Sequence, residues 1–141
     1  MSQVERIVAE ALEWIGTPYR HQGRRKGLGC DCLGLVLGVW HAVCGSAPAA
    51  PDRYAPDWSV SGGGEMFLEA VRKHCVEKRP AEMAPGDLLL FRWRNSLRAG
   101  HAGILVAPGQ FVHAYQRGFV SRSPLQPWRR RLAGVFAFPK S

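Results

Sequence analysis

The chain has 141 residues, 46% of them hydrophobic and 21% charged, and it has no apolar run long enough to cross a membrane. These values predict one folded domain over residues 1–141, without a secretory signal, and they exclude wholesale disorder and a membrane span. The formal net charge of +8 predicts attraction to a polyanion such as nucleic acid, anionic lipid or an anionic cell envelope.

The chain begins with an expected helix. Ser2 and Glu5 form a capping box, and apolar residues then recur at helical spacing up to Gly16. Pro18 cannot continue this helix. Residues 20–29 are rich in glycine and basic side chains and are predicted to form a loop.

A second helix is predicted from about Cys32 to Cys44. Apolar residues lie on nearly every side of it, which indicates a central, buried position. Residues 45–63 contain many prolines and glycines and are expected to be a surface loop, and a third helix should cover about Glu65–Glu77.

The period then changes to that of strands. Short β-type runs separated by turn residues occupy residues 88–91, 101–106, 111–115 and 134–138. Helices followed by strands are typical of an α+β domain, with helices packed on one face of an antiparallel sheet.

Cys32 lies where the second helix is expected to begin. Exposed N–H groups and the positive end of the helix dipole favour a thiolate there, so Cys32 is a candidate nucleophile. On position alone, a buried small hydrophobic residue is the more common case, because most free cysteines are of that kind.

The other cysteines are Cys30, Cys44 and Cys75, and we expect all four to be thiols rather than disulfides. Cys30, Cys32, His41 and Cys44 have the ligand types of a zinc site. If one helix joins Cys32 to Cys44, those two ligands lie about three turns apart, which disfavours the metal. We expect no cofactor.

Two histidines lie on adjacent β-type runs. Residues 107–110 (APGQ) are typical of a hairpin turn, which would place His101 and His113 on neighbouring antiparallel strands. They share a sheet face only if the connection has an odd number of residues or contains a bulge. In that register His113 could hydrogen-bond one ring nitrogen of His101, whose other nitrogen would point toward the helix of Cys32, completing nucleophile, base and orienting group.

The motifs of this chain resemble those of a known family. Residues 16–19 (GTPY), 31–36 (DCLGLV), 85–89 (PGDLL) and 101–104 (HAGI), followed by His113, look like the NlpC superfamily of papain-like cell-wall cysteine peptidases in order and spacing. The fuller segments, 16–22 (GTPYRHQ) and 29–36 (GCDCLGLV), are similar to the subgroup found in tailed phages and gene transfer agents. The resemblance implies a papain-like α+β fold.

The resemblance also implies roles for individual residues. It places the nucleophile at Cys32, the general base at His101 and the orienting residue at His113. It places at Tyr19 a tyrosine that could donate to the oxyanion or the substrate, and at Asp31 an acidic residue that meets the substrate's free amine. Leu33 departs from the family, in which many members have serine, and this leaves the substrate subsite open.

The function implied is hydrolysis of peptidoglycan stem peptides near the bond from D-γ-glutamate to diaminopimelate or lysine. The expected setting is the tail tip of a phage-like particle, made in the cytoplasm and acting on the cell wall in the periplasm, with hub-type tail proteins as partners. No zinc-finger, RNA-binding or helix-turn-helix pattern is present, so sequence-specific nucleic-acid binding is not expected.

Two other functions stay open. A structural tail or hub protein could retain a peptidase-like fold for assembly alone, although the complete set of Cys, His, His and Tyr favours activity. The same fold could also carry another acyl chemistry, such as amide or thioester transfer.

Overall fold

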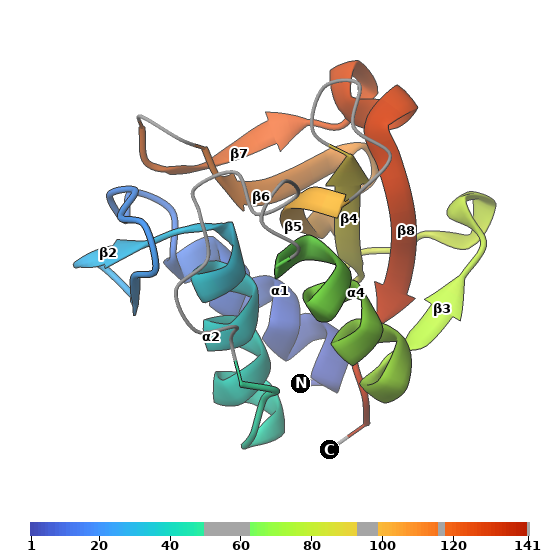
Figure 1. Ribbon diagram of the computed structural model, residues 1–141, viewed down its shortest axis with the longest axis horizontal. Coiled ribbons are helices and arrows are strands. Elements are labelled where there is room, and N and C mark those ends of the chain that lie inside the picture. Colours follow the sequence, from blue (N-terminus) through green and yellow to red (C-terminus); the bar gives the residue numbers. More distant parts are fainter. Residues whose placement is uncertain (50–62, 93–98, 116–117, 141) are drawn as a thin grey trace.

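The computed structural model describes residues 1–49, 63–92, 99–115 and 118–140. Their largest feature is a six-stranded antiparallel sheet. Three helices cover one face of it, α1 (Gln3–Glu13), α2 (Cys32–Cys44) and α4 (Gly63–His74) (Figure 1). The predicted α+β class, with helices on one face of an antiparallel sheet, is confirmed.

The sheet has strands that the sequence did not suggest. Its order across the sheet is β3 (Val76–Lys78), β8 (Leu132–Ala137), β4 (Leu88–Arg92), β5 (Ala99–Ala107), β6 (Gln110–Ala114) and β7 (Val120–Pro124). Both edge strands, β3 and β7, were missed. The third helix was predicted to reach Glu77 but ends at His74, because the next residues extend and pair with β8. Two short 3-10 helices are also present, η1 (Pro80–Glu82) and η2 (Gln126–Arg131).

The first two helices begin where their caps predict. Ser2 Oγ accepts the Glu5 N–H at 3.1 Å and the Glu5 carboxylate accepts the Ser2 N–H at 3.1 Å, so the capping box is present. Helix α2 starts at Cys32 and ends at Cys44, as predicted, and is closed by Gly45 in the left-handed conformation, φ 82°. The buried residues of α2 lie around most of its circumference, which confirms its central position.

The sheet has a hydrophobic cluster on each face. The main cluster lies between the sheet and the helices and includes Ala102 and Ile104 of β5. A smaller cluster on the outer face includes Leu105 of β5 and packs against Trp128 of η2. Since side chains alternate along a strand, odd-numbered positions at this part of β5 face away from the helices.

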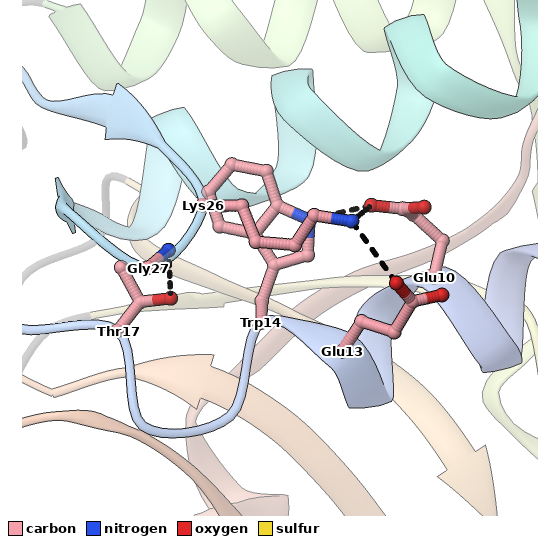
Figure 2. Close-up of polar contacts among 6 residues, drawn as sticks. All are labelled: Glu10, Glu13, Trp14, Thr17, Lys26 and Gly27. Atoms are coloured by element: carbon pink, nitrogen blue, oxygen red, sulfur yellow. Dashed lines mark hydrogen bonds and ion pairs between the residues drawn. The ribbon is translucent and has the colours of Figure 1, made fainter.

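The basic loop over residues 20–29 is more ordered than predicted. It contains a two-stranded hairpin, β1 (Arg24–Arg25) paired with β2 (Gly29–Cys30). Lys26 at its tip lies 2.7 Å from a Glu10 carboxylate oxygen and 3.2 Å from one of Glu13 (Figure 2). Figure 2 also shows the Gly27 N–H donating to Thr17 Oγ1, at 2.9 Å. The hairpin is thus fastened to α1 and the turn after it.

The predicted surface loop over residues 45–63 falls mostly outside the described residues. No helix in the described ranges is both long and apolar enough to cross a membrane.

Candidate active site

Cys32 is the first residue of α2, and Asp31 is the N-cap. The Asp31 backbone is extended, and its Oδ1 accepts the Gly34 N–H at 2.7 Å, which fixes the first turn. Cys32 is 4% exposed. The N–H groups of a first turn have no acceptor within the helix, so the backbone around Cys32 favours negative charge.

Asp31 also holds the preceding loop against the start of α2. Its Oδ2 accepts the Gln22 N–H at 2.8 Å and lies 3.9 Å from His21 Nδ1. The residue is 2% exposed. Both carboxylate oxygens therefore have partners in the protein, and the expected contact of Asp31 with a substrate amine stays a prediction.

Tyr19 lies beside the start of α2. It forms a bridge with Cys30, and its N–H donates to the Gly118 carbonyl oxygen at 2.9 Å. Burial raises the pKa of the Tyr19 hydroxyl well above its ordinary value, and the negative charges of Cys32 and Asp31 raise it further. The Tyr19 hydroxyl is thus a proton donor at all physiological pH values.

A bulge brings the two histidines onto one face of the sheet. Strands β5 and β6 are joined by a two-residue turn, and their register shifts between Leu105 and Ala107. The shift places His113 across from Gly103, where an added Cβ would lie only 3.2 Å from that of His113. Of the connections that the sequence allowed, the structure has the bulge.

The two imidazoles are hydrogen-bonded. His101 Nε2 lies 2.8 Å from His113 Nδ1, and His113 Nε2 lies 2.9 Å from Ser123 Oγ on β7. Burial lowers the pKa of His101 well below its ordinary value, with a further contribution from His113, and burial lowers the pKa of His113 to about 4. Both rings are consequently neutral near pH 7. Ser123 was missed from the sequence, because β7 itself was missed.

Trp128 is the second residue that the sequence did not suggest. Its indole is stacked on His101, with centroids 5.1 Å apart and planes 24° from parallel, and it meets His113 edge to face at 5.2 Å. The Arg131 guanidinium carbon lies 5.7 Å from the centre of the indole. Because Trp128 belongs to none of the motifs, only its place in the fold reveals it.

The histidine rings lie on the outer face of the sheet. His101 pairs with Phe91 on β4, and both rings pack in the aromatic group around Trp128. Helix α2 covers the opposite face. That the other ring nitrogen of His101 points toward Cys32 stays a prediction, and it requires both residues to lie at the same end of the strands.

Backbone hydrogen bonds place the start of α2 at that end. The Cys30 N–H donates to the Pro18 carbonyl oxygen at 3.0 Å, and Pro18 forms a bridge with Phe119. The next residue, Val120, begins β7 and pairs with Ala114, the neighbour of His113. Figure 1 shows α2 starting beneath β6 and β7, beside β2. Cys32 and the histidine pair thus occupy the same end of the sheet.

The cysteines are all free thiols. Cys32 and Cys44 begin and end a single 13-residue helix, which holds them about 18 Å apart at 1.5 Å per residue and rules out the zinc set considered above. Within the described ranges no three side chains of His, Cys, Asp or Glu gather as metal ligands.

Residues 16–136 match the model of a family described as the NlpC/P60 family. The Gamma-DL-glutamyl hydrolase of Bacillus subtilis (strain 168) is 29% identical over 134 residues, which are 94% of this chain and 29% of that protein. The Probable endopeptidase NlpC of Escherichia coli (strain K12) is 30% identical over 112 residues, which are 79% of this chain and 62% of that protein. The chain therefore spans less than two thirds of either relative.

Solved structures agree with the sequence relatives. The NlpC/p60 domain of the peptidoglycan hydrolase SagA superposes with a TM-score of 0.71 at 25% identity, over 96% of this chain and 98% of that one. NlpC1 from Trichomonas vaginalis gives a TM-score of 0.73 at 18% identity, over 98% of this chain and 45% of that one, which shows the shared fold alone.

Proposed function

The chain belongs to the NlpC/P60 family, and on that premise we propose that it is a cysteine peptidase that cleaves the stem peptides of peptidoglycan. Cys32 is the nucleophile, His101 the general base and His113 the residue that orients the base. The observation that carries the proposal is the hydrogen-bonded series His101, His113 and Ser123 at the end of the sheet where Cys32 begins α2.

The series supports one protonation pattern that suits catalysis. A hydrogen bond between two ring nitrogens needs one N–H and one lone pair. If His101 Nε2–H donates to His113 Nδ1, then His113 Nε2–H donates to Ser123 Oγ, and the lone pair of His101 is on Nδ1. In the opposite pattern His113 Nδ1–H donates to His101 Nε2. The proton of His101 is then on its Nδ1, and that nitrogen cannot act as a base. The first pattern is the catalytic one.

The reaction then needs no external base. As the Cys32 sulfur attacks the substrate carbonyl carbon, its proton passes to His101 Nδ1, which is neutral in the resting site and able to accept it. The resulting imidazolium protonates the departing amine, and the acyl group stays on sulfur as a thioester. Water, deprotonated by His101, hydrolyses the thioester and restores the thiol.

The oxyanion formed in this reaction would have two donors. One is the backbone N–H of Cys32 in the first turn of α2. The other is the Tyr19 hydroxyl, which stays protonated because of its burial and the charges beside it. Each donor in a site of this type contributes about 3 kcal/mol to stabilisation of the transition state.

The substrate proposal is the bond between D-γ-glutamate and diaminopimelate or lysine. It is supported by relatives whose names describe a γ-glutamyl hydrolase and a peptidoglycan hydrolase. Leu33, which replaces the serine of many family members, is 0% exposed and belongs to the main cluster. It packs in the core, so we expect its effect on the substrate to be indirect.

The biological setting is a further part of the proposal. The resemblance of residues 16–22 and 29–36 to the phage and gene transfer agent subgroup supports a place at a tail tip, beside hub-type proteins, with action on the wall of the target cell. The alternative is an inactive structural tail protein with the same fold.

One experiment separates the enzyme from the structural protein. Purified peptidoglycan fragments are incubated with the protein and with its Cys32→Ala variant, and the products are identified by mass spectrometry. We expect new amino and carboxyl ends at the γ-glutamyl bond with the wild-type protein alone. Intact fragments in both samples would favour the structural role, and cleavage by both would remove Cys32 from the mechanism.

A further inference from the structure

We infer that the arginine hairpin, residues 20–29, forms a subsite for a free carboxylate of the peptide substrate. The inference rests on the proposed peptidase function and adds to it the chemistry that the enzyme recognises beside the scissile bond. The hairpin lines a pocket of about 520 Å³, whose walls include Arg20, Arg24, Arg25 and Leu28. None of the described residues that line it is acidic.

The basic residues of the hairpin differ in their partners. Lys26 is neutralised by Glu10 and Glu13, as Figure 2 shows. Its neighbours Arg24 and Arg25 are exposed and make no ion pair with any described residue. Lys26 thus binds the hairpin to α1, whereas Arg24 and Arg25 are exposed to solvent at the pocket.

Hydrogen bonds within the hairpin hold the pocket in shape without a ligand. The Leu28 N–H donates to the Arg25 carbonyl oxygen at 3.1 Å, and the Gly23 N–H donates to that of Arg20 at 2.9 Å. The Arg20 side chain lies over Gly29, where any Cβ would collide with it. A preformed site loses less conformational entropy on binding than a flexible basic loop would.

The pocket adjoins the first turn of α2. A side chain at Gly34 would collide with the Gly23 carbonyl oxygen, so the hairpin and the turn that carries Cys32 are in direct contact. The Asp31 N–H also donates to Gly23, at 3.3 Å. Positions 32 and 34 lie about 200° apart around the helix, so the arginines flank the start of α2 on the side away from the Cys32 side chain. A peptide bound with its carbonyl at Cys32 would reach them by extending across the N-terminal end of α2.

The geometry favours a carboxylate on a short peptide. Guanidinium groups bind carboxylates through two parallel hydrogen bonds, and Leu28 offers an apolar surface for the methylene groups beside such a carboxylate. A volume of about 520 Å³ is that of a small-ligand site, whereas a polyphosphate chain would need an extended basic track. Stem peptides carry free carboxylates next to the γ-glutamyl bond, so the substrate supplies the group that the pocket fits.

The test uses two peptides that differ in one group. A γ-D-glutamyl tripeptide with a free α-carboxylate is compared with its α-carboxamide form, and binding to the Cys32→Ala protein is measured by calorimetry. We expect the carboxylate peptide to bind about five- to tenfold more tightly. The Arg24→Gln/Arg25→Gln variant should lose this preference, and Arg24→Lys/Arg25→Lys should retain part of it.

A matched control removes the same charge elsewhere. Arg72→Gln/Arg79→Gln alters two arginines that flank β3, at the opposite edge of the sheet from β7, and should leave the preference unchanged. Circular dichroism establishes that each variant is folded. Because binding is measured without turnover, the result does not depend on whether the wild-type protein hydrolyses the peptides.

Three outcomes would overturn the inference. Equal binding of the two peptides by the Cys32→Ala protein would exclude a carboxylate subsite, even if the wild-type protein cleaves peptidoglycan. An equal loss in the Arg72/Arg79 variant would show a general effect of charge. Tighter binding of soluble poly(glycerol phosphate), lost in the Arg24/Arg25 variant, would assign the pocket to a phosphate polymer.

Discussion

The indole of Trp128 is stacked on the imidazole of His101, and the same indole meets the edge of His113. Trp128 packs on the outer face of the sheet, and the stacking restricts the orientation of the His101 ring there. It also covers a hydrogen-bonded imidazole pair in which both members are buried, His101 at 5% and His113 at 2% exposure. A residue outside every motif thus packs against the proposed base.

Trp128→Ala should lower kcat roughly 10- to 100-fold with little change in KM, because a misplaced base affects the reaction more than binding. Trp128→Phe preserves an aromatic face and should retain most activity. Side-chain nitrogen shifts of the two histidines, measured by NMR, should move in Trp128→Ala and not in Trp128→Phe. A folded Trp128→Ala protein with unchanged shifts and kcat would contradict the positioning role.

Replacement of the two histidines should have unequal effects. His101→Ala removes the proposed base and should lower turnover at least about 100-fold. His113→Asn should lose less, because an amide oxygen can still accept the His101 N–H, whereas His113→Ala leaves a buried donor without a partner at a cost of about 1–3 kcal/mol. Steady-state rates of the folded variants measure this order. An active His101→Ala and an inactive His113→Asn would make His113 the base.

Cys32 should be the most reactive of the four thiols. Burial raises the pKa of Cys30 and of Cys75 to about 12, and burial also raises the pKa of Cys44. Cys32 instead lies at the positive end of the α2 dipole. Limited alkylation with iodoacetamide near pH 7, followed by peptide mapping, should label Cys32 first. Earlier labelling of any other cysteine would argue against the assignment.

Stability should decrease as the pH falls below 6.5. Burial lowers the pKa of His113 from 6.5 to about 4 and that of His101 in the same direction, so between these values the unfolded chain binds protons that the folded protein does not. Each histidine then contributes at most about 1.4 kcal/mol per pH unit to the loss. Urea unfolding at pH 5.0 to 7.0 measures the slope, which should be shallower in His113→Asn. The same slope in both proteins would show that His113 does not carry the effect.

The sequence was sufficient for features set by near neighbours in the chain. The capping box at Ser2, the start of α2 at Cys32 and its end before Gly45 all depend on hydrogen bonds over three or four residues. A common sheet face for His101 and His113 could also be predicted as one option, because the hairpin connection allowed few registers. The sequence left two options for that register, a connection with an odd number of residues or a bulge, and did not distinguish between them.

The features that were missed depend on contacts between distant segments. Strand β7 has a mixed pattern of exposed and buried residues, and its pairing with β6 places Ser123 beside His113. Strand β3 is a short edge strand that exists because β8 is next to it. The hairpin over residues 24–30 is held by carboxylates of α1, so its local glycines and arginines suggested only a loop.

The sequence by itself predicted the proposed catalytic residues, Cys32, His101 and His113, the position of Cys32 at a helix start and, as one option, a common sheet face for the two histidines. Only the tertiary structure decided on which side of the sheet the imidazoles lie and that Ser123 and Trp128 complete their surroundings. The physical reason is the distance along the chain over which each kind of interaction acts. Caps, turns and strand alternation act over a few residues, whereas the position of Trp128 follows from the path of η2 over the outer cluster, which no local pattern encodes.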